Sequence, residues 1–254
     1  QAPPRWPQLV QAMFVHIADM GSMRTEPFSP EVYERMVEMD ANLAAPLLTA
    51  LPSTPEWVLR TLVSSEPHGA VSHPNASAAV VLLAMDCGDE ISPDGLARSV
   101  RSTDAIRAVF SSATDGDEVW KVLAGREDVP QEIYRDISET SSFAVKRILA
   151  GNPSALRDPT VVENLSTSQS PQIAISLIRA GCCVGPTLAT LLRKIAAPSD
   201  LAEALKSFRQ RIETGEDLGL NPSDMKPFLS SSDPDIRESA ILLLSRTARG
   251  RPNR

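Results

Sequence analysis

Three cysteines and three histidines are the residues of this chain whose side chains suit thiol or metal chemistry. Adjacent Cys182 and Cys183 rarely bridge each other, because disulfide geometry favours Cα atoms that lie farther apart. His68 and His73 do not have the spacing of a helical zinc pair, and Cys87 is the only soft ligand near them. We therefore expect no disulfide framework, no metal site and a reducing, cytoplasmic environment.

Other catalytic or cofactor-binding patterns are missing from the sequence. The acidic stretch at 86–90 has alternating carboxylates but lacks the glycine position and the final glutamate of a calcium loop. We find no glycine-rich phosphate loop, no paired-cysteine metal spacing, no His-Glu-x-x-His and no Gly-x-Ser-x-Gly. The sequence thus predicts a protein that is not an enzyme and that needs no cofactor.

The remaining candidates for a functional site are arginines. Arg98, Arg101 and Arg107 lie close together in the sequence, and three later arginines recur near the ends of predicted helices, where they could line one ridge. We take four residues as candidate partner-binding residues: Arg101, Arg126, Arg147 and Arg179. The competing interpretation is that such arginines cap helix C-termini or pair with neighbouring carboxylates.

The elements that must position these arginines are clearest in residues 122–181, which contain two similar segments and the start of a third. Each segment opens with an apolar pair followed by Ala-Gly, at Val122–Gly125 and Ile148–Gly151. A proline, an apolar run with helical spacing, a serine-rich break and a short apolar run follow. The segments are offset by roughly 26 to 29 residues, a period typical of stacked repeats.

This pattern resembles the leucine-rich repeat variant family and, more loosely, HEAT-type helical repeats. The matching features are the Leu-Ala-Gly openings, Asn152-Pro153, and serine breaks followed by apolar and basic residues, as at Ser142–Lys146. The close match covers about a quarter of the chain. The resemblance implies an all-α fold, a right-handed α-solenoid of short stacked helices, used mostly as a binding surface. Some variant-repeat proteins carry an iron–sulfur cluster on N-terminal cysteines, a feature that this chain does not share.

The 21 prolines also favour many short helices. Several follow a serine, threonine or aspartate, whose side-chain oxygen can cap a helix while the proline occupies the first helical position. These pairs are Ser29-Pro30, Thr54-Pro55, Ser92-Pro93, Asp158-Pro159, Ser170-Pro171 and Asp233-Pro234.

The repeat-like layout recurs at residues 51–58, 165–173 and 228–237, so we expect a single helical-repeat domain over 1–254. Residues 1–7 read as a loose lead-in, and residues 247–254 as a basic flexible tail. No apolar run approaches the length needed to span a bilayer. The sequence predicts neither the identity of a partner nor the oligomeric state.

Charge and composition bear on the kind of partner. The net charge of −7 and the 4 % aromatic content disfavour nucleic-acid binding, although a local basic patch stays open. We expect a protein–protein interaction module or scaffold that presents a curved helical surface to a protein or peptide. One alternative is a HEAT-like nucleic-acid-binding protein or DNA glycosylase, which would need its arginines on one concave face. Another is an inhibitor or immunity-type protein with an acidic surface.

Overall fold

The computed structural model describes residues 28–39, 41–87, 91–113, 117–140, 142–195, 197–213 and 218–249. These residues form sixteen α-helices and one 3₁₀-helix, and none of them lies in a β-strand, which confirms the all-α prediction. The predicted lead-in at 1–7 lies outside the described residues. In the predicted tail, residues 247–249 belong to the last helix, and residues 250–254 lie outside.

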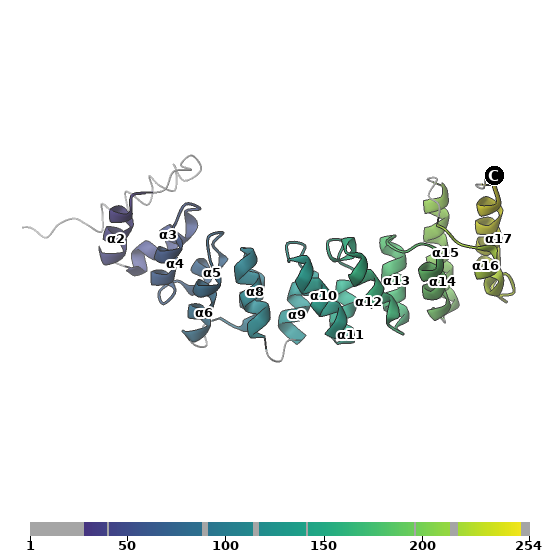
Figure 1. The fold of residues 1–254 in the computed structure, drawn as a ribbon, viewed down its shortest axis with the longest axis horizontal. Coiled ribbons are helices and arrows are strands. Elements are labelled where there is room, and N and C mark those ends of the chain that lie inside the picture. Colours follow the sequence, from purple (N-terminus) through teal and green to yellow (C-terminus); the bar gives the residue numbers. More distant parts are fainter. Residues whose placement is uncertain are drawn as a thin grey trace, which may run out of the picture. The chain divides into compact units, whose positions relative to one another are not determined.

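The described residues up to Leu123 form one compact unit, in which alternate helices contact each other. Helices α2, α4, α6 and α8 make one row, and α3, α5 and α7 make a second row that packs against it. Figure 1 shows α2, α4, α6 and α8 following one another in chain order. Their bounds are α2 (Pro30–Met39), α3 (Ala41–Ala50), α4 (Glu56–Leu62), α5 (Pro67–Ser72), α6 (Ala78–Asp86), α7 (Pro93–Ser99) and α8 (Thr103–Ser112).

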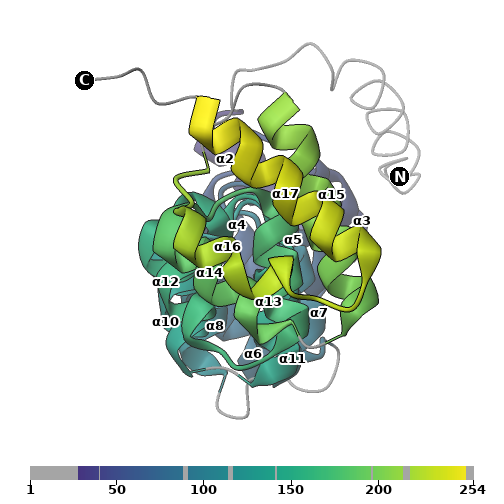
Figure 2. The same cartoon turned by 90° about the vertical axis from the view of Figure 1, so that its right-hand side faces the viewer.

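The described residues from Ala124 onward form a second compact unit, and the boundary falls inside α9 (Asp117–Gly125). One row contains α11, α13, α15 and α17, each in contact with the next; α10 contacts α12, and α14 contacts α16. Figure 2 shows α17 beside both α15 and α16. The bounds are α10 (Gln131–Thr140), α11 (Phe143–Leu149), η1 (Ala155–Arg157), α12 (Pro159–Thr167), α13 (Pro171–Ala180), α14 (Gly185–Lys194), α15 (Pro198–Glu213), α16 (Pro222–Leu229) and α17 (Pro234–Arg249).

This pairing of rows is compatible with a helical repeat fold. The handedness of a solenoid, the repeat family and the continuity of one array over both units stay predictions. Among the described helices, none is both long and apolar enough to cross a membrane.

The proline-based reading of helix starts is confirmed at five of the six listed pairs, because α2, α7, α12, α13 and α17 each begin at the proline of such a pair. The side-chain oxygens of Ser92, Asp158 and Ser170 accept backbone N–H bonds in the first turn of their helices. The exception is Thr54-Pro55. Here the threonine hydroxyl bonds to Leu48 O, 2.5 Å away, and α4 begins one residue after the proline.

The three Ala-Gly sites of the repeat segments do not share one backbone conformation. Gly181 caps α13 in the left-handed region, with φ 73°, where a side chain would be strained. Gly125 and Gly151 have no such positive φ. The similarity between the segments therefore includes the helices on either side of each glycine but not the way in which each helix ends.

Candidate partner-binding site

The loops of the second unit are fixed by a buried amide, Asn152. Its Nδ2 donates to the carbonyl oxygen of Ala124 at 2.8 Å and to that of Arg126 at 2.5 Å. Its Oδ1 accepts the N–H of Ser154 at 2.9 Å. Asn152 thus joins the end of α11 to the end of α9, and the carbonyl groups left unpaired at the end of α9 gain partners.

Tyr134 of α10 completes this network. Its ring is buried, and its hydroxyl donates to the carbonyl oxygen of Arg126. Burial raises the pKa of the Tyr134 phenol, and the hydrogen bond with Asn152 partly offsets this effect. The phenol is therefore a neutral donor at physiological pH, which suits a structural role at this position.

Arg126, the first candidate of this unit, is engaged within its own loop. Its Nε and one terminal nitrogen bond the two carboxylate oxygens of Asp128 at 2.8 and 2.6 Å, and its side chain is only 16 % exposed. A bidentate pair of this kind is rigid and geometrically specific. Arg126 therefore shapes the loop between α9 and α10.

Arg147 lies on α11 and differs from Arg126 in its surroundings. It is exposed, and among the residues that the structure describes it forms no ion pair. Phe143, one helical turn earlier on the same helix, is 49 % exposed. Residues four apart on a helix share a face, so α11 presents an aromatic ring and a guanidinium side by side.

Arg179 lies in the last turn of α13, the neighbour of α11 in the same row. One of its terminal nitrogens is 2.7 Å from Glu203 Oε1 on α15, and both side chains are more than half exposed. An ion pair this exposed contributes little to stability, because water and salt screen it. The pair can therefore open toward a partner at small cost.

Arg101 belongs to the first unit, where it is exposed between α7 and α8. Three further arginines, which a nucleic-acid-binding protein would need on one concave face, pair with carboxylates of their own unit. These are Arg98 with Asp94 at 3.1 Å, Arg107 with Asp104 at 3.1 Å, and Arg193 with Asp224 at 3.3 Å.

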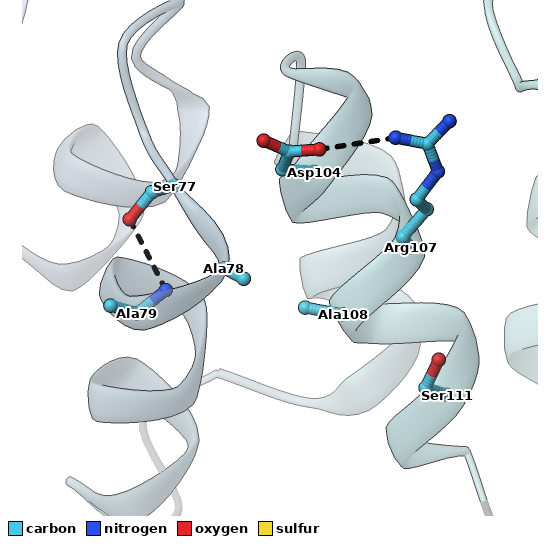
Figure 3. A pocket seen from close by; sticks show the side chains of 7 residues that line it. All are labelled: Ser77, Ala78, Ala79, Asp104, Arg107, Ala108 and Ser111. Atoms are coloured by element: carbon cyan, nitrogen blue, oxygen red, sulfur yellow. Dashed lines mark hydrogen bonds and ion pairs between the residues drawn. The ribbon is translucent and has the colours of Figure 1, made fainter.

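The first unit also has a shallow hollow between α6 and α8, of about 490 Å³. Ser77, Ala78 and Ala79 line one wall; Asp104, Arg107, Ala108 and Ser111 line the other (Figure 3). The Asp104–Arg107 ion pair and the hydrogen bond from Ala79 N–H to Ser77 Oγ are both within this lining. These polar groups bond one another, and the alanines leave the hollow open because they are small.

His73, which the sequence does not predict to be a metal ligand, has a structural role. It is buried, its Nε2 lies 2.7 Å from Leu51 O, and its Nδ1 accepts the N–H of Asn75. These partners fix the neutral tautomer with the proton on Nε2. Among the described residues, no three His, Cys, Asp or Glu side chains are grouped so that they could hold a metal ion.

Two residues of this region were missed in the sequence. Phe143 belongs to a short apolar run, which suggests a buried position, but the structure exposes it. Asn152 appeared only as part of a motif. A polar amide directly after a repeat glycine is the signal that could have identified it as a buried bridge, because a buried loop carbonyl needs a donor.

No protein-family model, curated protein or solved structure matches this chain.

Proposed function

We propose that this protein is a non-enzymatic interaction module that binds a protein or peptide through the exposed face of α11 and its neighbours in the second unit. The observation that carries the proposal is the pair Phe143 and Arg147, which lie one turn apart and are both exposed.

Aromatic and arginine side chains are the residue types enriched at the energetic centres of protein interfaces. When a partner covers the Phe143 ring, the apolar surface of the ring is removed from water, and this favours binding. Arg147 has no ion pair among the described residues, so a partner carboxylate would not have to displace one. The exposed Arg179–Glu203 pair on α13 and α15 would form a polar rim.

The test begins with capture of partners from native extract by the tagged full chain, with and without nuclease. A captured protein is then purified, and its affinity is measured directly. We expect Phe143→Ala with Arg147→Glu to weaken this affinity by at least about tenfold, the loss typical of a central contact.

Two matched substitutions serve as controls. Leu82→Ala removes an apolar side chain that is as exposed as Phe143, at 49 %, but lies in the first unit. Arg157→Glu reverses an exposed charge elsewhere in the second unit. Equal losses for the control and test variants would contradict the proposed surface. Recovery of nuclease-sensitive material alone would favour the nucleic-acid alternative.

A further inference from the structure

Two adjacent cysteines form the turn between α13 and α14. Helix α13 ends at Gly181, whose N–H bonds Ile178 O at 3.1 Å, and Cys182 and Cys183 follow directly. Cys182 is half-buried, whereas Cys183 is buried. Cys182 is therefore the more exposed residue of the pair.

The two sulfur atoms are in contact. The distance between Cys182 Sγ and Cys183 Sγ is 3.8 Å, within hydrogen-bonding range for sulfur. The Cys182 thiol donates a hydrogen bond to the carbonyl oxygen of Leu177, 3.5 Å from its sulfur, in the last turns of α13. The pair is therefore held with its sulfur atoms facing each other.

Arg211 of α15 brings positive charge to this turn. One of its terminal nitrogens donates to the carbonyl oxygen of Gly181 at 3.0 Å. A side chain at Gly181 would meet the guanidinium carbon of Arg211 at 3.5 Å, so the charged group lies against the residue before Cys182. This charge offsets the negative end of the α13 dipole, which would otherwise disfavour a thiolate here.

These surroundings affect the two thiols in opposite directions. The pKa of Cys182 is lowered, because the Cys183 thiol donates to its sulfur; burial opposes this, and the backbone N–H of Cys182 and the Arg211 charge add to it. The pKa of Cys183 is raised by its neighbour Cys182 and by burial. The Cys182 sulfur is thus the better nucleophile of the two.

We propose that Cys182 and Cys183 form a thiol–disulfide exchange site for small disulfides, with Cys182 as the attacking sulfur and Cys183 as the resolving sulfur. The Cys182 thiolate attacks one sulfur of a disulfide R–S–S–R, whose S–S bond breaks. The first R–S⁻ leaves and takes up a proton from water. That proton balances the one that Cys182 released to water when it became a thiolate.

Cys183 then attacks Cys182 Sγ, the nearest electrophilic sulfur. The proton of Cys183 passes through water to the second leaving thiolate. Two protein thiols are oxidised to one disulfide, and R–S–S–R is reduced to two R–SH. No other oxidant is needed.

The product ring should be easily reduced. Neighbouring Cα atoms lie about 3.8 Å apart across a trans peptide, which is below the usual range for disulfide-linked cysteines. Strained disulfides have more oxidising potentials and are readily broken by thiols. The oxidation is therefore reversible under mildly reducing conditions, unlike that of a structural disulfide.

The test uses the purified full chain and the aromatic disulfide 5,5′-dithiobis(2-nitrobenzoic acid), whose released thiolate absorbs visible light. The exposed Cys87, in the first unit, is an internal reference thiol. We expect the pair to release the chromophore about tenfold faster than Cys87. In a Cys87→Ser background, the protein should afterwards carry no label and be two hydrogens lighter.

Substitutions assign the two roles. Cys183→Ser should leave one stable label on Cys182, Cys182→Ser should remove the fast phase, and Arg211→Gln should slow it more than Arg211→Lys. An unchanged Cys87 rate and an unchanged circular dichroism spectrum show that each variant is folded. The proposal is overturned if the pair reacts no faster than Cys87, or if labels remain on both sulfur atoms of the Cys87→Ser protein.

Discussion

The side-chain nitrogen of Asn152 lies 2.8 Å from the carbonyl oxygen of Ala124, although 28 residues separate them in the sequence. The same nitrogen also bonds the carbonyl oxygen of Arg126, 26 residues earlier, which is the offset between Gly125 and Gly151 in the two repeat segments. This second contact is therefore a bridge between equivalent points of successive segments, made by a single amide that also bonds Ser154 N–H.

Replacing Asn152 by alanine should destabilise the second unit. The carbonyl oxygen of Ala124 and the N–H of Ser154 lose their side-chain partner together, whereas Arg126 O keeps the Tyr134 hydroxyl. Each group left unpaired costs about 1–3 kcal/mol. We expect a loss of about 3 kcal/mol in the free energy of unfolding, measured by urea titration with far-UV circular dichroism.

The chain provides two controls for this experiment. Trp57 on α4 and Trp120 on α9 both lie within residues 1–123, so the fluorescence of these two tryptophans follows the first unit, whose transition should be unchanged. Asn164→Ala removes one bond, from Nδ2 to Ser138 Oγ at 2.9 Å, and should cost less. Equal losses in the free energy of unfolding for Asn152→Ala and Asn164→Ala would mean that Asn152 stabilises the unit no more than an amide with a single hydrogen bond.

Asp158 should be tested separately, because it has two roles at the start of α12. Its Oδ1 accepts the N–H of Thr160 at 2.9 Å, and its Oδ2 accepts Arg135 Nε at 2.5 Å. We expect Asp158→Ala to cost about 2 kcal/mol. Asp158→Asn should cost less, because asparagine still caps the helix while losing the ion pair.

The pH dependence of the Asp158 variants provides a further check. Burial opposes ionisation, but the Thr160 N–H and Arg135 outweigh it and lower the pKa of this carboxyl below its ordinary value of 3.8. The stabilising contribution is thus complete above that value and is lost as the pH falls below it. The difference between wild type and Asp158→Asn should shrink in acid, and a constant difference would contradict the assigned charge.

The all-α class and most helix starts were predictable because both depend on local chemistry. A serine or aspartate before a proline determines the first turn of a helix by hydrogen bonding and a fixed φ, as at Ser92-Pro93 and Asp158-Pro159. Thr54-Pro55 failed because Thr54 bonds Leu48 O, six residues earlier, a preference that only the packed structure creates.

The candidate site was harder to predict, because the role of a polar residue depends on residues distant in sequence. Three equivalent positions after a repeat glycine show this. Arg126 pairs with Asp128, Asn152 bridges to the previous segment, and Cys182 contacts Cys183. The repeat pattern locates such positions, but it does not say which partner each side chain meets.

A buried histidine gives the first unit its own pH dependence. The pKa of His73 is lowered from 6.5 because burial disfavours the charged ring, although the bond to Leu51 O opposes this. The unfolded chain therefore binds a proton more readily than the folded unit. The stability contributed by the neutral His73 ring is fully present above about pH 6.5 and is lost as the pH falls through and below that value.

His73→Gln should remove this dependence between about pH 7 and 5. The substitution should also cost about 1–2 kcal/mol at pH 7, because glutamine pairs Leu51 O and Asn75 N–H less well. Tryptophan fluorescence in urea at several pH values measures both effects. His68, which is exposed, is the matched control for the loss of an imidazole, and His68→Gln should change the free energy of unfolding at pH 7 by less than about 0.5 kcal/mol.

Phe143 should separate binding from stability. Nearly half of its side chain is exposed, so little apolar surface returns to water when it is truncated. We expect Phe143→Ala to change the free energy of unfolding by less than about 1 kcal/mol. The same substitution should weaken the affinity for the captured partner by about tenfold or more. Val145→Ala, on the buried side of the same helix, should lower the free energy of unfolding, because it leaves a cavity in the core, and should leave the affinity for the partner unchanged. A large loss of stability for Phe143→Ala, measured by urea unfolding, would mean that the ring packs as a core residue and would remove the main support for a binding surface on α11.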